Sequence, residues 1–340
     1  MSGRWIRAIS VAVALVAVGT GLWVYQARQG ASISSEVITE AFTDERAAAL
    51  PVPPHSVGLS FYLLIRNLDG ARVVIPDRPH RFEELQSVED LARIQRRKSF
   101  EVYTNSLGMR GEELESPKKR FRILCVGDSH TFGWGVTEEE TYPARLAEEL
   151  GVEVINGGVP AMKPDDVAQW VDAHAPTIQP DLLLFGIRPP PSQVNWDPYL
   201  SALRSMAGAV DPAPVGVVLP PVSTFDYDPR IQIREGELLA QRVPGVPVLE
   251  LTTPFLQAQT EGAVMEPWGS GYRLIELPSR RVIVEASAEP GGTPRAIAQA
   301  FESEPDLEAS LFFDGSHVDA KGYRIWATEV ARWIRGQGWL

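Results

Sequence analysis

The fold is decided by the stretch Arg122-Ile-Leu-Cys-Val-Gly-Asp-Ser-His-Thr-Phe-Gly-Trp-Gly135. Its apolar part, Ile123 to Val126, stops abruptly at Gly127-Asp128-Ser129, which is the pattern of a short buried strand followed by a turn. The next segment, Thr137-Glu-Glu-Glu140, has the spacing of a helix capping box and precedes a helical pattern of apolar residues. We therefore expect Ser129 on the turn at the carboxyl end of a strand, ahead of a helix.

A serine in this position is well placed for chemistry. In open α/β sheets, ligands bind outside the carboxyl ends of the strands. The hydroxyl is exposed there, and nearby backbone N–H groups can face a developing negative charge. Gly, Asp and Ser are also common turn residues, so the segment taken alone fits an ordinary turn equally well.

Composition and charge narrow the class of protein. The chain has 340 residues and is 44% hydrophobic, which indicates a globular protein with one large or two modest domains. Its formal net charge of −12 argues against a nucleic-acid partner, because phosphate binding requires clustered Lys and Arg. The single cysteine, Cys125, excludes an internal disulfide and a multi-cysteine zinc site. Inside its apolar run, we expect it to act as a small core residue.

The first 30 residues predict a transmembrane anchor. Two arginines precede an apolar run from Ala8 to Tyr25, close to the length of about 20 residues that spans a bilayer. Aromatic residues flank this run, and no small-x-small cleavage site follows directly. We favour an uncleaved anchor over a cleaved signal peptide. The positive charge before the span places the rest of the chain on the periplasmic or extracellular side.

Composition divides the remaining chain into a linker at 31–56, a small appendage at 57–119 and a main domain at 120–340. The appendage is expected to be α+β, with strands at 59–65 and 72–75 and a charged helix at 82–97. In the main domain, strands and helices alternate, and the strands are largely apolar. This pattern predicts a three-layer α/β/α domain with a parallel sheet covered on both faces. The expected strands are 121–126, 152–155, 181–187, 215–219 and 246–251; the expected helices are 138–150, 165–175, 198–206, 231–242 and 320–336. A Gly-Pro-rich insertion at 262–300 contains one strand candidate, Arg281–Glu285.

A nucleophilic serine needs a base, and the base needs an orienting partner. Among the five histidines, His317 is the best candidate, because it lies in a loop before the last helix. Asp314, three residues earlier, can meet its Nδ1, although an Asp-Gly turn with a capping histidine also fits this segment. The other four are His55 in the linker, His80 in the appendage, His174 at a helix end and His130, whose side chain we expect to point away from Ser129. Because the histidines are scattered, the sequence predicts no metal site. It also contains no Gly-x-x-x-x-Gly-Lys-Ser/Thr loop, and Gly133-Trp-Gly135 alone is a weak dinucleotide signal, so no cofactor is expected.

Three segments together resemble the SGNH (GDSL-type) hydrolase family: Gly127-Asp128-Ser129, Asn156-Gly-Gly-Val-Pro160 and Asp314-x-x-His317. The segment Tyr103-Thr-Asn-Ser-Leu-Gly-Met-Arg-Gly111 is also similar to one in membrane-anchored bacterial members. The resemblance runs from about Tyr103 to the carboxyl terminus. It implies a flavodoxin-like fold, with Ser129 as nucleophile and oxyanion donor, His317 as general base and acid, and Asp314 as its orienting residue.

Two positions depart from the family pattern. Ala161 stands where a glycine N–H contributes to the oxyanion hole, and it retains an N–H. Gly186-Ile187-Arg188-Pro189 replaces the block whose asparagine is a further donor. Arg188 either donates to the oxyanion in its place or forms a structural salt bridge, and the sequence leaves both open. Loss of one such donor typically costs about 2.7–4 kcal/mol.

The sequence thus predicts a membrane-tethered ester hydrolase or O-acyltransferase. Its substrate would be an O-acyl ester of a small molecule, a polysaccharide or a lipid. The alternative is a protein that keeps the fold, has little or no activity, and binds a glycan or lipid. Candidates for an aromatic substrate surface are Trp134, Trp196, Tyr199 and Trp268. No oligomeric state is indicated.

Overall fold

The computed structural model describes residues 71–74, 99–160, 162–190, 194–222, 229–269, 271–286, 311–312 and 317–340. The anchor expected over residues 1–30, the linker, the strand at 59–65 and the helix at 82–97 lie outside these ranges. Within them, no helix combines the length and apolarity that crossing a bilayer requires. The boundaries of the linker and the appendage remain predictions.

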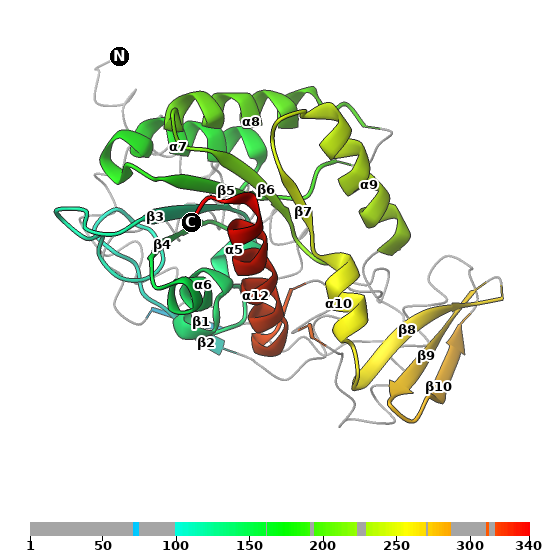
Figure 1. Cartoon of the computed structure of the whole chain (residues 1–340). Helices are drawn as coiled ribbons and strands as arrows, with labels where there is room; N and C mark the ends of the chain where they lie inside the picture. The colour runs from blue at the N-terminus through cyan, green and yellow to red at the C-terminus, as the bar shows by residue number, and fades with distance from the viewer. Residues whose placement is uncertain are drawn as a thin grey trace, which may run out of the picture.

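The centre of the fold is a five-stranded parallel sheet (Figure 1). Its strands are β3 (Arg122–Gly127), β4 (Glu153–Gly158), β5 (Leu182–Gly186), β6 (Val215–Leu219) and β7 (Val248–Glu250). Their spatial order, β4-β3-β5-β6-β7, is 2-1-3-4-5 in chain order, the flavodoxin-like doubly wound arrangement. The predicted parallel sheet is confirmed. Every residue of β3, β5 and β6 is buried, which explains why these strands, apart from Arg122 at the start of β3, are continuous apolar runs.

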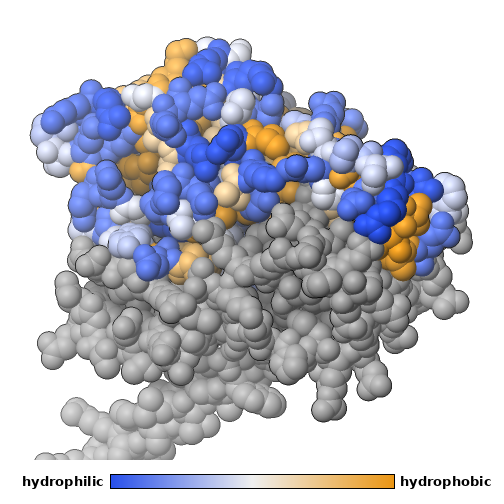
Figure 2. All heavy atoms as spheres, turned by 90° about the horizontal axis from the view of Figure 1, so that it is seen from below, coloured by the Kyte–Doolittle hydropathy of each residue, from blue (hydrophilic) through white to orange (hydrophobic). Residues whose placement is uncertain are grey.

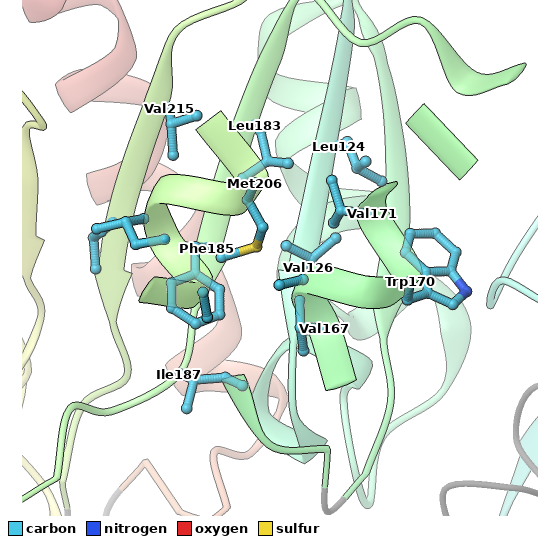
Figure 3. Close-up of a cluster of buried hydrophobic side chains, with 14 of the residues drawn as sticks. Leu124, Val126, Val167, Trp170, Val171, Leu183, Phe185, Ile187, Met206 and Val215 are labelled. Carbon is cyan, nitrogen blue, oxygen red and sulfur yellow. The ribbon is translucent and has the colours of Figure 1, made fainter. Parts of the chain in front are cut away.

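Helices cover both faces of this sheet, so the domain has three layers. One face packs against α7 (Pro164–Ile178), α8 (Asp197–Val210) and α9 (Pro229–Arg242). The close-up in Figure 3 shows this core, where side chains of β3 and β5 meet those of α7 and α8. Because side chains alternate along a strand, Leu124 and Val126 enter this core whereas Ile123 and Cys125 enter the other.

The second core lies under α6 (Tyr142–Leu150), α10 (Thr252–Ala258) and α12 (Ala320–Gln337). The ring of Tyr142 stacks on Trp326 with centroids 4.7 Å apart, which joins α6 to α12. Along α12, Tyr323, Trp326, Val330 and Ile334 recur at helical spacing and are all buried, so this apolar stripe is core packing. Burial raises the pKa of Cys125 to about 12, so this thiol is a core residue. Figure 2 shows one face of the molecule, on which most of the described residues are hydrophilic and the hydrophobic residues lie in small separate areas.

The structure corrects several predicted elements. The helix expected at 138–150 is a 3₁₀ turn, η4 (Glu138–Glu140), followed by α6, because the Thr141 hydroxyl accepts from Ala144 N and starts a new helix. The described part of the 262–300 insertion has three strands instead of one: β8 (Gly262–Trp268), β9 (Gly271–Leu277) and β10 (Arg281–Ala286). They form an antiparallel sheet apart from the main one (Figure 1). In the appendage, β1 (Ala71–Val74) pairs with an unpredicted β2 (Ser99–Val102).

Candidate active site

The nucleophile candidate lies on a tight turn at the carboxyl end of β3. Ser129 is the first residue of α5 (Ser129–Phe132), a four-residue helix that ends at Gly133 in the left-handed region. The Asp128 side chain caps this helix by accepting from the backbone N–H of His130 at 2.9 Å. This confirms the strand–turn–helix placement of Ser129 that its sequence context predicts.

Glycines at the ends of the neighbouring strands allow α5 to lie directly on the sheet edge. Gly127 of β3 is in register with Gly158 of β4 and Gly186 of β5. A Cβ on Gly158 would lie 2.2 Å from the backbone N of Phe132, and a Cβ on Gly186 would lie 2.5 Å from Thr131 Oγ1. Real side chains do not approach this closely, so the position of Ser129 depends on these glycines.

Arg110 holds the loop that follows α5. Its buried guanidinium donates to the backbone carbonyls of Phe132, Gly133 and Val136, each at 2.8 Å. It also pairs with Glu138 at 2.8 Å. Burial lowers the pKa of Arg110, and Glu138 opposes that shift. The sequence showed Arg110 only as part of a family-like segment, because a clasp onto carbonyls has no sequence signature.

Asn156 of β4 supports the same turn from the other side. Its side-chain nitrogen donates to the Phe132 carbonyl at 3.1 Å, and its side-chain oxygen accepts from Gly158 N at 3.1 Å. Asn156, in the segment Asn156-Gly-Gly158, therefore holds the helix that carries Ser129.

The structure brings Ser129 and His317 together. His317 Nε2 lies 2.9 Å from Ser129 Oγ, although 188 residues separate them in the chain. Two contacts fix this approach. Asp319 caps α12 by accepting from Gly322 N at 2.7 Å, and the Tyr323 hydroxyl of α12 donates to the backbone carbonyl of His130 at 2.8 Å. The helix after His317 is thereby bonded to the turn that presents Ser129.

Of the other three predicted site residues, the structure describes Arg188. Asp314 and Ala161 lie outside the described residues. Arg188 follows β5, and its Nη2 lies 3.3 Å from His130 Nε2 and 3.4 Å from the carbonyl oxygen of Pro221. Its guanidinium is therefore at the carboxyl edge of the sheet, near the Ser129–His317 pair.

His130, whose side chain was expected to point away from Ser129, lies within the site beside His317. Its ring stacks on that of His317, with centroids 5.2 Å apart and an interplanar angle of 30°. The cause is the Asp128 carboxylate, which accepts from the backbone N–H of His130 and lies 3.0 Å from its Nδ1. These two contacts fold the imidazole back over the turn.

Charge and burial determine the protonation states of the cluster formed by Asp128, His130 and Arg188. Burial lowers the pKa of His130 below its ordinary value of 6.5, and Asp128 only partly offsets this. For Asp128, burial acts to raise the pKa, but His130 and Arg188 outweigh it and the pKa falls below 3.8. At neutral pH the cluster thus contains a carboxylate, a neutral imidazole and a guanidinium.

The aromatic candidates separate into three environments. Trp134 lies beside the site, with its ring centroid 6.3 Å from that of His317. Trp196 and Tyr199 are buried in the first core, where the Tyr199 hydroxyl donates to Ile187 O, so both are excluded as an exposed substrate surface. Trp268 is 49% exposed and lies on β8, in the small antiparallel sheet.

Solved structures with a similar fold include proteins described as esterases. A G-D-S-L family protein from Desulfitobacterium hafniense is 14% identical, with a TM-score of 0.41, over 62% of this chain and 98% of its own. A catalytic mutant of an acetylxylan esterase from Geobacillus stearothermophilus is 15% identical, with a TM-score of 0.38, over 64% and 94%. A family 3 carbohydrate esterase from Clostridium thermocellum is 12% identical, with a TM-score of 0.36, over 64% and 96%.

The sequence matches no protein-family model and no curated protein.

Proposed function

We propose that this chain is an SGNH-type serine hydrolase or acyltransferase that acts on O-acyl esters. The observation that carries the proposal is the 2.9 Å contact between Ser129 Oγ and His317 Nε2 at the carboxyl edge of a parallel sheet. A serine hydroxyl is a weak nucleophile until a base accepts its proton, and this contact supplies that base directly.

The reaction follows from this pair. His317 Nε2 accepts the proton as Ser129 Oγ bonds to the acyl carbon, and it then returns the proton to the leaving alcohol oxygen. The acyl-enzyme is resolved by water in a hydrolase or by a second alcohol in a transferase. We assign to Asp314 the role of holding His317 Nδ1, and to the N–H groups of Ser129 and Ala161 two oxyanion donors.

Arg188 is the proposed third donor. Its guanidinium lies next to His130, whose ring stacks on that of His317. A charge-assisted donor is stronger than a neutral amide, so an arginine can serve where an asparagine is missing.

The test uses the full-length chain in detergent with a short-chain aryl acetate and an organophosphonate probe. We expect turnover and covalent labelling of Ser129, and both should be abolished in Ser129→Ala. The matched control is Ser205→Ala, since Ser205 is exposed on α8 and bonds only outside the site, to Asp172. Turnover by Ser129→Ala equal to wild type would remove Ser129 from the mechanism. Absence of both labelling and turnover in the wild type would favour the glycan- or lipid-binding alternative.

Residues 1–30 are proposed to tether this domain to a membrane, with the domain on the periplasmic or extracellular side. Their apolar run and preceding arginines support this proposal. Full-length protein should stay in the membrane pellet after alkaline carbonate washing, whereas a chain lacking residues 1–30 should not. Release of the full-length chain by carbonate would contradict a spanning anchor.

A further inference from the structure

We propose that His130 is a positioning residue whose neutral imidazole holds the Arg188 guanidinium beside the Ser129–His317 pair. This inference deepens the proposed function and rests on it. The described residues of the site contain a second connected set of side chains, Asp128, His130 and Arg188, next to the serine–histidine contact.

Hydrogen-bond chemistry assigns the tautomer of His130. Arginine has only donors, so the 3.3 Å contact between Arg188 Nη2 and His130 Nε2 requires Nε2 to be the acceptor. The ring proton then resides on Nδ1, which faces the Asp128 carboxylate at 3.0 Å. Both ring nitrogens are thereby satisfied by a single neutral tautomer.

The surroundings of His130 favour the same state. The charged and titratable side chains that face its ring are Asp128, Arg188 and His317, while Tyr323 bonds its backbone carbonyl. Protonation of His130 would place a second cation against Arg188 and remove the acceptor at Nε2. Burial lowers the pKa of His130, which keeps the imidazole neutral and available to Arg188.

This arrangement fixes Arg188 at one point of the sheet edge. His130 belongs to the turn after β3, and Pro221, the second acceptor, follows β6. Arg188 itself follows β5, so its guanidinium is tied to segments that follow the strands on both sides of its own. An oxyanion donor stabilises a transition state only when it is aimed in advance, and a long arginine side chain needs such acceptors to be held.

Three substitutions of His130 separate the functions of its two nitrogens. His130→Gln places a carbonyl oxygen near the position of Nε2 and can still accept from Arg188. His130→Asn places an amide nitrogen near Nδ1 and can donate to Asp128, but it leaves Arg188 without that acceptor. His130→Phe keeps a ring to stack on His317 and makes neither hydrogen bond.

In full-length protein with an aryl acetate, we expect His130→Asn and His130→Phe to lower kcat about tenfold to a hundredfold, with KM little changed. His130→Gln should stay within a few-fold of wild type. In an Arg188→Met background, His130→Phe should add little further loss, because the two residues act as one unit. Wild-type kcat in His130→Phe, or full additivity with Arg188→Met, would overturn the inference.

A readout independent of activity is the nitrogen NMR spectrum of the histidine rings. We expect His130 to show the Nδ1–H tautomer, and its pKa to rise in Arg188→Met, since that substitution removes a neighbouring cation. An Nε2–H tautomer in the wild type, or an unchanged pKa in Arg188→Met, would refute the Arg188–His130 contact even if the ester hydrolase assignment held. Failure of the proposed function instead gives an inactive wild type that keeps the predicted tautomer.

Discussion

At the scale of single residues, the site holds two opposite charges, on Asp128 and Arg188, and offsets the cost of their partial burial with hydrogen bonds. Asp128 and Arg188 are separated by one neutral imidazole, and each of the two nitrogens of that ring faces one of them. A buried carboxylate or guanidinium is costly unless it is paired and hydrogen-bonded. The residue types were visible in the sequence, but their convergence depends on the direction of the His130 ring. The stacking of this ring on His317 was not predicted, because the Asp128 carboxylate orients the ring through a side-chain contact.

The shifted pKa of His130 predicts a pH dependence of stability. Because its pKa is lower in the folded than in the unfolded state, the unfolded chain binds more protons below the ordinary value of 6.5. The stabilisation is therefore complete above that pH and is lost as the pH falls toward the folded-state value. Urea unfolding at about pH 7.5 and about pH 5 should show a larger loss of unfolding free energy for wild type than for His130→Phe. Burial raises the pKa of Glu138, so Glu138 contributes to stability in the opposite direction as the pH falls. Both proteins contain Glu138, so its contribution cancels when their losses of unfolding free energy are compared. Equal losses in both proteins would contradict this assignment.

At the scale of elements, β3, α5 and the loop to η4 behave as one unit. The apolar run of β3 and the turn residues after it made the strand and the position of Ser129 predictable. Three other features were not predictable. The break between η4 and α6 depends on a single cap at Thr141, and the three strands of the insertion depend on cross-strand pairing. The Arg110 clasp depends on backbone carbonyls that are distant in sequence.

Arg110→Met tests whether this unit depends on the clasp. The substitution removes the buried donors of three backbone carbonyls and leaves the half-buried Glu138 without its cation. Breaking a buried pair in this way typically costs about 3–5 kcal/mol, so a large fall in urea midpoint is expected. Arg120→Met is the matched control, since Arg120 is half exposed and pairs with Glu115 at the surface, where little change is expected. Similar midpoints for the two variants would show that the clasp contributes no more than a surface pair.

At the scale of the whole molecule, the candidate site depends on the last helix returning to the first strand of the sheet. The apolar stripe of α12 indicated only core packing, and the family resemblance of the segments around Ser129 and His317 made this return predictable. The distance between Ser129 and His317 was not, because it is set by contacts such as the one from Tyr323 Oη to His130 O, across 193 residues. The alternation of strands and helices alone fits several orders of the five strands, and only the family resemblance of the motifs implied the flavodoxin-like order.

Tyr323→Phe tests this long-range connection. It removes one buried hydrogen bond, so the unfolding free energy should fall by about 1 kcal/mol. Because the bond ties the helix after His317 to the turn that carries Ser129, we also expect kcat for an aryl acetate to fall while KM changes little. Tyr103→Phe is the control, since the Tyr103 side chain is 41% exposed and its hydroxyl bonds Glu101 at the surface. If Tyr323→Phe lowered stability and left kcat equal to that of the control, the hydroxyl would stabilise the fold without aligning the serine–histidine pair.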